Sequence, residues 1–330
     1  GRRRAPGPCG GAADPAAVGG AQELLNRAWS ETPEAVSTQH AVIVVPNEPM
    51  TAAGGFAAQA FATLPRRVTG RTLTTAFTKF AVVGHGAGGD RPGVSFGEDV
   101  CGAGGLTDGF AADAFSIEAQ SHLSHFAPHF IDCGSAAAAC TGTGTGLVQQ
   151  LAFLGALLGP NKSIAGDLLP VMMHGEGFQL GTRLGDALAL LVAPGAIWEA
   201  ERVLFVVAGD LSRGLRPAEA RHCDARAVEV LQSRGAPQIA EYFGALRDGR
   251  VAEGCRGPDA LPEGYSTLLT ASRVAQRTQL TSRRAAVEHR LDGVTRGYTW
   301  MLFWADTRSV WERLYPNTQA SLLAGGARLG

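Results

Sequence analysis

The chain has 330 residues, of which 45% are hydrophobic and 18% are charged, and its formal net charge at pH 7 is -1. A chain of this length can bury a large core. Its balanced charge gives no steering toward nucleic acid or an anionic membrane, and no apolar stretch reaches the roughly 20 residues that a membrane span needs. We therefore expect neither nucleic acid nor a membrane among its partners.

The predicted elements alternate between helices and short strands. In chain order they begin with a helix at 21–29, a strand at 41–45, a helix at 54–64 and a strand at 80–84. A glycine-rich loop is expected at 86–113, followed by a helix at 115–129 and a segment of low complexity at 136–146. The remaining elements are a helix at 147–158, a strand at 168–173, a helix at 180–191, a strand at 203–208, helices at 217–234, 239–246 and 266–276, and a strand at 294–304.

Four of these strands are short apolar runs that do not alternate with polar residues. This pattern is typical of parallel strands that are buried on both faces by helices. Together with the alternation of elements, it predicts an α/β fold with a single doubly wound domain, a mostly parallel central sheet and helices on both faces. We place this domain at residues 1–306 and expect a short helix and a tail at 307–330.

Polar residues follow each of the four apolar runs. Because ligands bind at the carboxyl ends of parallel strands in such folds, these residues are predicted to line a pocket. They are Asn47, Glu48, His85, His174, Asp210 and Arg213. A small anionic or aromatic ligand or a protein partner is the expected occupant, and no catalytic residue is assigned. Arg213 and Arg216 suit an anionic ligand if both face the pocket, and the alternative is a local ion pair between Asp210 and Arg213.

The six cysteines are scattered, and no two of them form a CxxC pair. A disulfide framework is not expected in a domain of this size, so the cysteines indicate a reducing compartment, and we predict the cytoplasm. The chain does not begin with methionine, a start that removal of an organellar presequence would leave, so an organellar matrix stays open.

Two further patterns have ordinary explanations. His122, His125 and His129 share one face of the helix expected at 115–129, where a metal site is the alternative to a half-exposed helix face. The Thr-Gly repeat at 141–146 resembles a phosphate-binding loop, but no Lys-Ser or Lys-Thr pair follows it directly.

Read in order, the strand-end segments resemble the Memo family, which includes AmmeMemoRadiSam system protein B. The similar segments are 40–64, 80–89, 150–175, 206–214, 255–258 and 294–298. The resemblance implies the fold of the class III extradiol dioxygenases. It also implies a metal cluster held by histidines on the strand-end turns, and it adds Cys255 to the pocket residues.

The chain departs from this family at most of the implied ligand positions. Asn47, Ala87 or Gly88, and Arg213 stand where histidines are expected, and Thr145 and Val148 stand where a histidine and a glutamate are expected. Asparagine is a poor ligand for iron or copper, and the charge of Arg213 opposes a cation. We therefore predict a catalytically degraded Memo-like protein without a cofactor. It would act by binding a ligand or a protein, or as a structural part of an assembly.

The alternative is a metal-dependent oxidoreductase of the extradiol dioxygenase type with rearranged ligands. In this interpretation iron or copper is held by His85, His174, Asp210 and Cys255. Cys255 could also act as a nucleophile if a histidine lies beside it.

Overall fold

A seven-stranded sheet forms the centre of the computed structural model. Its strand order is β5-β6-β4-β7-β1-β9-β8. The strands are β1 (His40–Val45), β4 (Lys79–Gly86), β5 (Gly93–Phe96), β6 (Leu168–His174), β7 (Val203–Ala208), β8 (Ser282–Leu291) and β9 (Thr295–Trp304). Strands β6, β4, β7 and β1 pair in parallel, whereas β5 and the β9–β8 pair add antiparallel strands at the two edges. The predicted fold class is confirmed.

The structure describes residues 15–31, 38–64, 66–69, 72–86, 93–96, 116–124, 145–158, 167–251, 255, 258–291 and 295–305. The loop residues 87–92 and 97–113, the segment 136–144 and the tail 307–330 lie outside this part of the chain. His125 and His129 also lie outside it.

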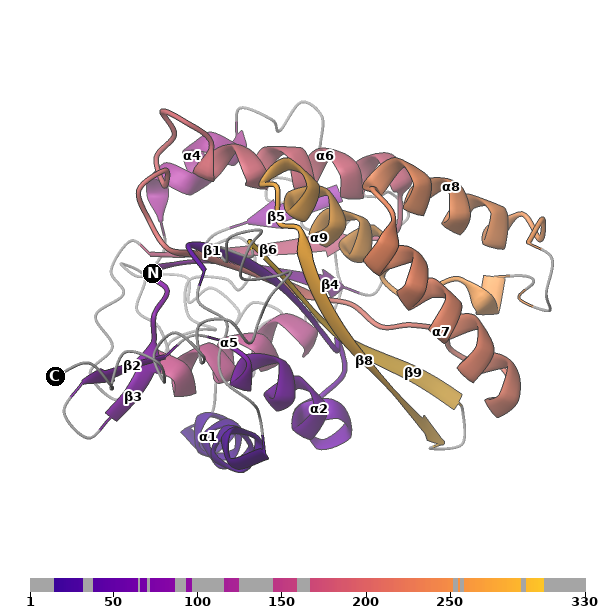
Figure 1. The fold of residues 1–330 in the computed structure, drawn as a ribbon, viewed down its shortest axis with the longest axis horizontal. Coiled ribbons are helices and arrows are strands. Elements are labelled where there is room, and N and C mark those ends of the chain that lie inside the picture. The colour runs from indigo at the N-terminus through magenta and orange to yellow at the C-terminus, as the bar shows by residue number, and fades with distance from the viewer. Residues whose placement is uncertain are drawn as a thin grey trace, which may run out of the picture.

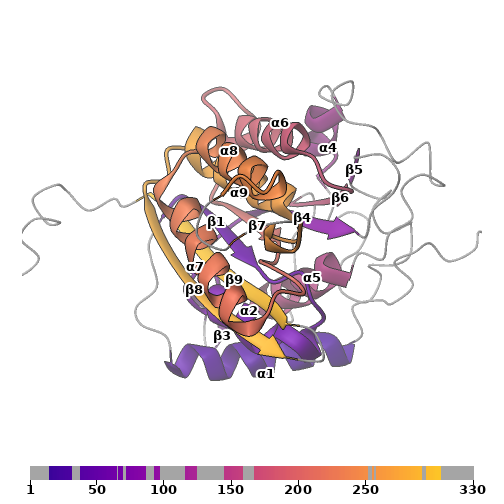
Figure 2. The same ribbon diagram turned by 90° about the vertical axis from the view of Figure 1, so that its right-hand side faces the viewer.

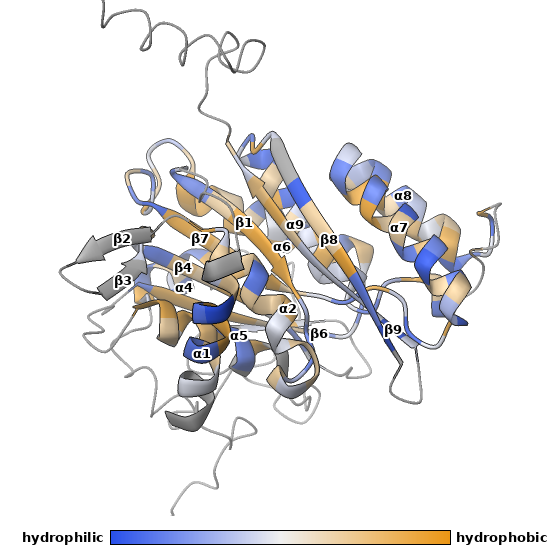
Figure 3. Cartoon of the chain, turned by 60° about the horizontal axis from the view of Figure 1, so that its bottom comes forward, coloured by the Kyte–Doolittle hydropathy of each residue, from blue (hydrophilic) through white to orange (hydrophobic). Residues whose placement is uncertain are grey.

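The central strands are buried on both faces, as their apolar sequences predict. Ala41, Ile43 and Val45 of β1 belong to one hydrophobic cluster, and Val42 and Val44 belong to the other. Successive side chains of a strand point to opposite faces, so a strand without polar residues contributes apolar side chains to the clusters on both faces of the sheet. Figure 3 shows these central strands as hydrophobic, whereas hydrophilic residues interrupt the β8–β9 pair.

Helices cover both faces of the sheet (Figures 1 and 2). One face packs against α1 (Pro15–Glu31), α2 (Met50–Ala62) and α5 (Thr145–Leu158). The other packs against α4 (Ile117–Ser124), α6 (Phe178–Ala189), α7 (Pro217–Ser233), α8 (Ala236–Arg247) and α9 (Tyr265–Arg277). Short 3-10 turns are η3 (Leu190–Val192) and η4 (Pro258–Ala260). Within the described ranges, none of the helices has the length and apolar content that a membrane crossing requires.

The contact between α6 and α9 depends on glycine. A Cβ at Gly181 would lie 2.3 Å from the backbone oxygen of Ser266, so a larger residue there would push the two helices apart. Thr270 of α9 also donates a hydrogen bond to the backbone oxygen of Gly181, at 3.0 Å. This close packing fixes the amino end of α9 against the carboxyl end of β6.

Four strands were not predicted. β2 (Arg66–Thr69) and β3 (Thr72–Thr75) form a separate two-stranded sheet, and β5 lies within the predicted loop 86–113. The edge strand β8 was missed because charged residues break its apolar pattern. The helix predicted at 21–29 begins earlier, at Pro15.

Candidate functional site

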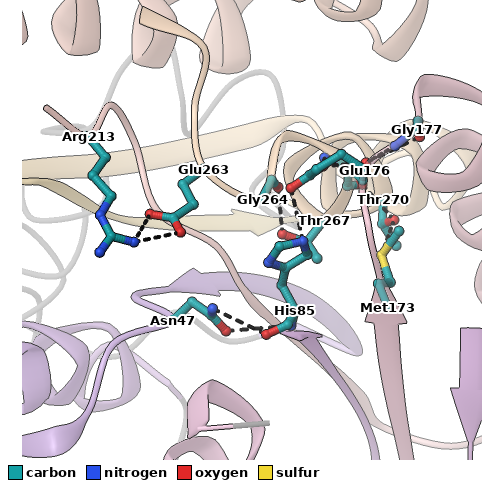
Figure 4. A network of polar contacts seen from close by, with 11 residues as sticks. Asn47, His85, Met173, Glu176, Gly177, Arg213, Glu263, Gly264, Thr267 and Thr270 are labelled. Carbon is teal, nitrogen blue, oxygen red and sulfur yellow. Dashed lines mark hydrogen bonds and ion pairs between the residues drawn. The ribbon is translucent and has the colours of Figure 1, made fainter. Parts of the chain in front are cut away.

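The predicted site residues on β1, β4 and β7 come together at the carboxyl edge of the sheet. Strand β7 lies between β4 and β1, so the residues that follow these three strands are neighbours. Asn47 connects them directly. Its backbone N–H donates to Asp210 Oδ1 at 3.0 Å, and its side-chain amide donates to the backbone oxygen of His85 at 3.3 Å. The backbone N–H of His85 donates to Asn47 Oδ1 at 3.5 Å (Figure 4). Asn47 is therefore a brace between strand ends.

His85 is held by a residue that strand-end reasoning did not select. Its Nε2 lies 3.0 Å from Glu176 Oε1, and the two side chains face each other in Figure 4. The other oxygen of Glu176 accepts hydrogen bonds from the backbone N–H and the hydroxyl of Ser266, at 3.0 and 2.6 Å. Ser266 lies in the first turn of α9, where the exposed N–H groups and the helix dipole stabilise a carboxylate. Glu176 is thus oriented by α9 and in turn orients His85.

The surroundings of His85 favour its charged form. Burial lowers the pKa of His85, but the contact with Glu176 and the charges of Glu176 and Glu263 outweigh burial and raise it overall, and Asp210 adds to this effect when it is ionised. The amino end of α9 also approaches the ring, because a Cβ on Gly264 would lie 3.9 Å from His85 Cγ. Gly264 has φ +79°, a left-handed conformation that glycine adopts without strain. Its small size and freedom let the chain pass beside the imidazole.

Asp210 is buried, with only 6% of its surface exposed. Burial raises its pKa to about 8, although the hydrogen bond from the Asn47 backbone acts against this change. The charges of Glu48 and Glu263 add to the effect of burial. Asp210 therefore carries a proton at pH 7 and can donate a hydrogen bond. No hydrogen bond joins its Oδ2 to another residue in the described part of the chain.

The arginines near the site are paired with glutamates. Arg213 contacts Glu263 at 3.0 Å, and Figure 4 shows this pair to one side of His85. The predicted ion pair of Arg213 with Asp210 is therefore wrong. Arg216 pairs with Glu219, and its side chain is 84% exposed, so it does not face the site as the anion hypothesis required. Glu48 pairs with Arg296 of β9.

His174 does not join this network directly. It ends β6, and its Nε2 lies 2.9 Å from the hydroxyl of Ser95 on β5. Burial and the charge of His85 lower the pKa of His174. Its Nδ1 is buried and has no hydrogen-bond partner in the described part of the chain. His174 lies at the end of a strand, as predicted, but its side chain contacts the edge strand β5.

Cys255 forms a disulfide with Cys223 of α7. Both residues are buried, and Cys255 precedes η4. The expectation that the cysteines stay reduced is wrong for this pair, and the cysteine argument for the cytoplasm no longer holds. A sulfur in a disulfide is neither a thiolate ligand nor a nucleophile, so both proposed roles of Cys255 are wrong in this form.

The donors of the rearranged metal site do not converge. Among the residues that the structure describes, no three His, Cys, Asp or Glu side chains lie together in a way that could hold a metal ion. Asn47 is engaged with the backbone of His85, and Cys255 is oxidised. Thr145 and Val148 lie in α5, and Ala87 and Gly88 lie outside the described residues. The residues that are described do not fit an iron or copper centre.

No model of a known protein family matches this chain, and a search of the curated proteins finds no match either. The similarity to the Memo family and the role of the site thus stay predictions, and the geometry alone must support any proposal. Glu176, Glu263 and Ser266 are the residues that the sequence interpretation missed. Glu176 follows His174 by two residues on a segment that was already of interest, whereas Glu263 and Ser266 come from the start of a helix.

Proposed function

We propose that the chain is a Memo-like α/β protein that binds a small carboxylate at the carboxyl edge of its sheet, without a redox metal. The supporting observation is the burial of Asp210, which raises its pKa to about 8 and keeps it protonated at pH 7. At pH 7 it is a hydrogen-bond donor, and Asn47 links it to His85, whose pKa is also raised. Two donors in one network suit the two oxygens of a carboxylate.

The contacts within the site leave these two donors available. Glu176 engages Nε2 of His85, so Nδ1 is the ring nitrogen left for a ligand. In Figure 4 this nitrogen is directed away from Glu176, toward the side on which Glu263 lies. Asp210 uses Oδ1 to accept from Asn47, which leaves Oδ2 for its proton. Burial and the charges of Glu48 and Asp210 raise the pKa of Tyr298, so this nearby phenol also stays protonated.

The charges around the site determine which ligands are favoured. Arg213 and Arg296 are neutralised by Glu263 and Glu48, and His85 is balanced by Glu176. With Asp210 protonated, the cluster has no excess charge, and a single carboxylate can be accommodated by donors alone. Ionisation of Asp210 above about pH 8 places a negative charge beside the ligand and opposes binding.

Calorimetric titration with benzoate tests this proposal, with benzyl alcohol as the uncharged comparison. We expect benzoate to bind at pH 6.5 and to bind about tenfold more weakly at pH 9, because Asp210 loses its proton above about pH 8. His85→Gln should weaken binding about tenfold or more, since it removes the charged donor. His222→Gln on the exposed surface of α7 is the matched control and should change nothing.

Asp210→Asn and Asp210→Leu separate donation from shape. The asparagine amide still donates, so binding should persist and lose the part of its pH dependence that arises near pH 8. The leucine variant should not bind. Benzoate affinity that rises with pH, or that is insensitive to both His85→Gln and Asp210→Leu, contradicts the proposal. Stoichiometric iron or copper in the purified protein, lost on His85→Ala, would contradict the absence of a metal.

A further inference from the structure

The two edges of the sheet differ in length. β5, at one edge, has four residues, whereas β8, at the other, has ten. β8 pairs with β9 on its inner side, and no other strand in the described part of the chain pairs with its outer side. Figure 2 shows the β8–β9 pair along the left-hand margin of the fold. A long strand with an open edge is a template for pairing with another strand.

The backbone of β8 shows which residues present hydrogen-bonding groups outward. The hydroxyl of Thr299, on β9, donates to the backbone oxygen of Ala286 at 3.0 Å, so this oxygen faces β9. In an antiparallel pair the N–H and C=O of one residue point to the same side, and neighbouring residues point to opposite sides. The backbone groups of Ala285 and Val287 are therefore directed to the open edge.

We propose that this edge is the interface of a homodimer, in which β8 pairs with β8 of a second copy in antiparallel register centred on Ala286. This proposal does not rest on the ligand site. In this register Arg284 lies directly opposite Glu288 of the second copy, and the symmetry of the dimer creates the same pair twice. Ala285 lies opposite Val287, so the outward backbone groups of both copies meet and can form hydrogen bonds.

The charges on β8 favour this register over the two centred further along the strand, on Val287 and on Glu288. In an antiparallel pair, side chains that lie opposite each other are on the same face of the sheet. A two-fold dimer of β8 can therefore be centred on any one residue, and each alternative register moves this centre by one residue. Centring on Val287 places Arg284 opposite Arg290, and centring on Glu288 places two glutamates together. Like charges directly opposite each other are destabilising, whereas opposite charges stabilise the pair. Of these three registers, only the one centred on Ala286 pairs opposite charges.

The side chains of β8 are compatible with this arrangement. The guanidinium of Arg284 lies over the ring of Trp304, 5.7 Å from its centre, which holds it on the face of the sheet. Glu288 contacts Arg290 at 2.7 Å on the same face. In the dimer Glu288 would lie between Arg290 of its own chain and Arg284 of the second copy, so its charge is balanced on both sides.

Sedimentation velocity of the full chain over a range of concentrations tests the dimer. We expect a monomer–dimer equilibrium, and Arg284→Glu or Glu288→Arg alone should weaken it about tenfold or more, because two attractive pairs become repulsive. The double variant Arg284→Glu/Glu288→Arg restores the pairs in reverse and should return the dissociation constant to within a few-fold of wild type. Arg27→Glu and Glu23→Arg on the exposed face of α1 are matched charge reversals that should have no effect.

Hydrogen exchange supplies an independent measurement. The backbone amides of Ala285 and Val287 should exchange more slowly as the protein concentration rises, while that of Ala286 should not change. A monomer at all concentrations, or a dimer in which the double variant associates no better than either single variant, overturns the proposal. Circular dichroism checks the fold of each variant. If one single variant unfolds, the double variant, which retains both charges, still tests the pairing.

Discussion

The two ends of the parallel strands arrange their charged groups differently. At the carboxyl ends, His85, Asp210 and their partners form one connected network. At the amino ends Lys79 contacts Asp167, and Arg202 donates to the backbone oxygen of Thr38 at 2.8 Å. Connected groups influence one another's protonation, whereas separate pairs mainly neutralise charge.

Protonation, rather than a cavity, distinguishes the two ends. A cavity of about 360 Å³ opens at the amino ends, lined by His40 and by residues 189, 190, 192–194 and 277–279. His40 is the titratable group there whose pKa is displaced, and burial lowers it, so it is neutral at pH 7. At the carboxyl ends two groups that Asn47 links have raised pKa values. Displaced and coupled protonation, which is common at functional sites, therefore identifies the carboxyl ends as the candidate site.

The largest expected effect comes from removing the disulfide that joins α7 to the segment before η4 and α9. Cys223 and Cys255 are 32 residues apart in sequence, and closing a loop of this size stabilises a folded chain by about 3–4 kcal/mol. Cys223→Ala/Cys255→Ala should lower the free energy of unfolding in urea by this amount under oxidising conditions. With a reducing agent present the wild type should approach the variant. Equal stability of the two proteins in oxidising buffer would show that the disulfide does not brace this region.

A smaller effect is expected from Asp210→Asn, and it sharpens the contrast in protonation. Because folding raises the pKa of Asp210 from 3.8 to about 8, the folded state binds more protons than the unfolded state between these values. The stability of the wild type should thus fall as the pH rises toward about 8, and the asparagine variant should lack this slope. Between pH 7 and pH 9 the wild type should lose about 1 kcal/mol relative to the variant in urea unfolding. Parallel pH profiles would contradict the buried, protonated state.

The smallest effect concerns His40 at the amino ends, and its sign is opposite. Folding lowers the pKa of His40, so its contribution to stability is present above the unfolded value of 6.5 and is lost as the pH falls through the folded pKa. His40→Gln should change the pH dependence by less than about 0.5 kcal/mol, because the imidazole is partly exposed. Titration of the histidine ring protons by NMR should give a midpoint below 6.5 for His40 and above 6.5 for His85. Midpoints in the reverse order would remove the distinction between the two ends.

The sequence was most informative where burial is complete. The runs of β1, β4, β6 and β7 predicted the parallel core because strands covered on both faces tolerate few polar residues. β8 was missed because an edge strand has less apolar surface to bury. Charged residues such as Arg284 and Glu288 therefore obscure the apolar pattern by which a strand is recognised. β2, β3 and β5 are only four residues long, which is too short for a pattern to emerge.

The candidate site was predicted in part for a similar reason. Residues at strand ends, such as Asn47 and Asp210, could be placed together because parallel strands share one edge. The position of Glu263 depends on how α9 and the segment before it pack over that edge, and sequence spacing does not encode such packing. The disulfide was missed because Cys223 and Cys255 come close only through the fold.

The brace at Asn47 also constrains how this protein can change. Its amide both donates to and accepts from the backbone of His85, and an uncharged amide keeps these bonds at any pH. An imidazole at this position has a different shape and could not make both contacts from one end of the side chain. A mutation from asparagine to histidine would therefore open the joint between two strands before any new chemistry arose. A histidine at this position would need compensating changes in the backbone turns that Asn47 now joins.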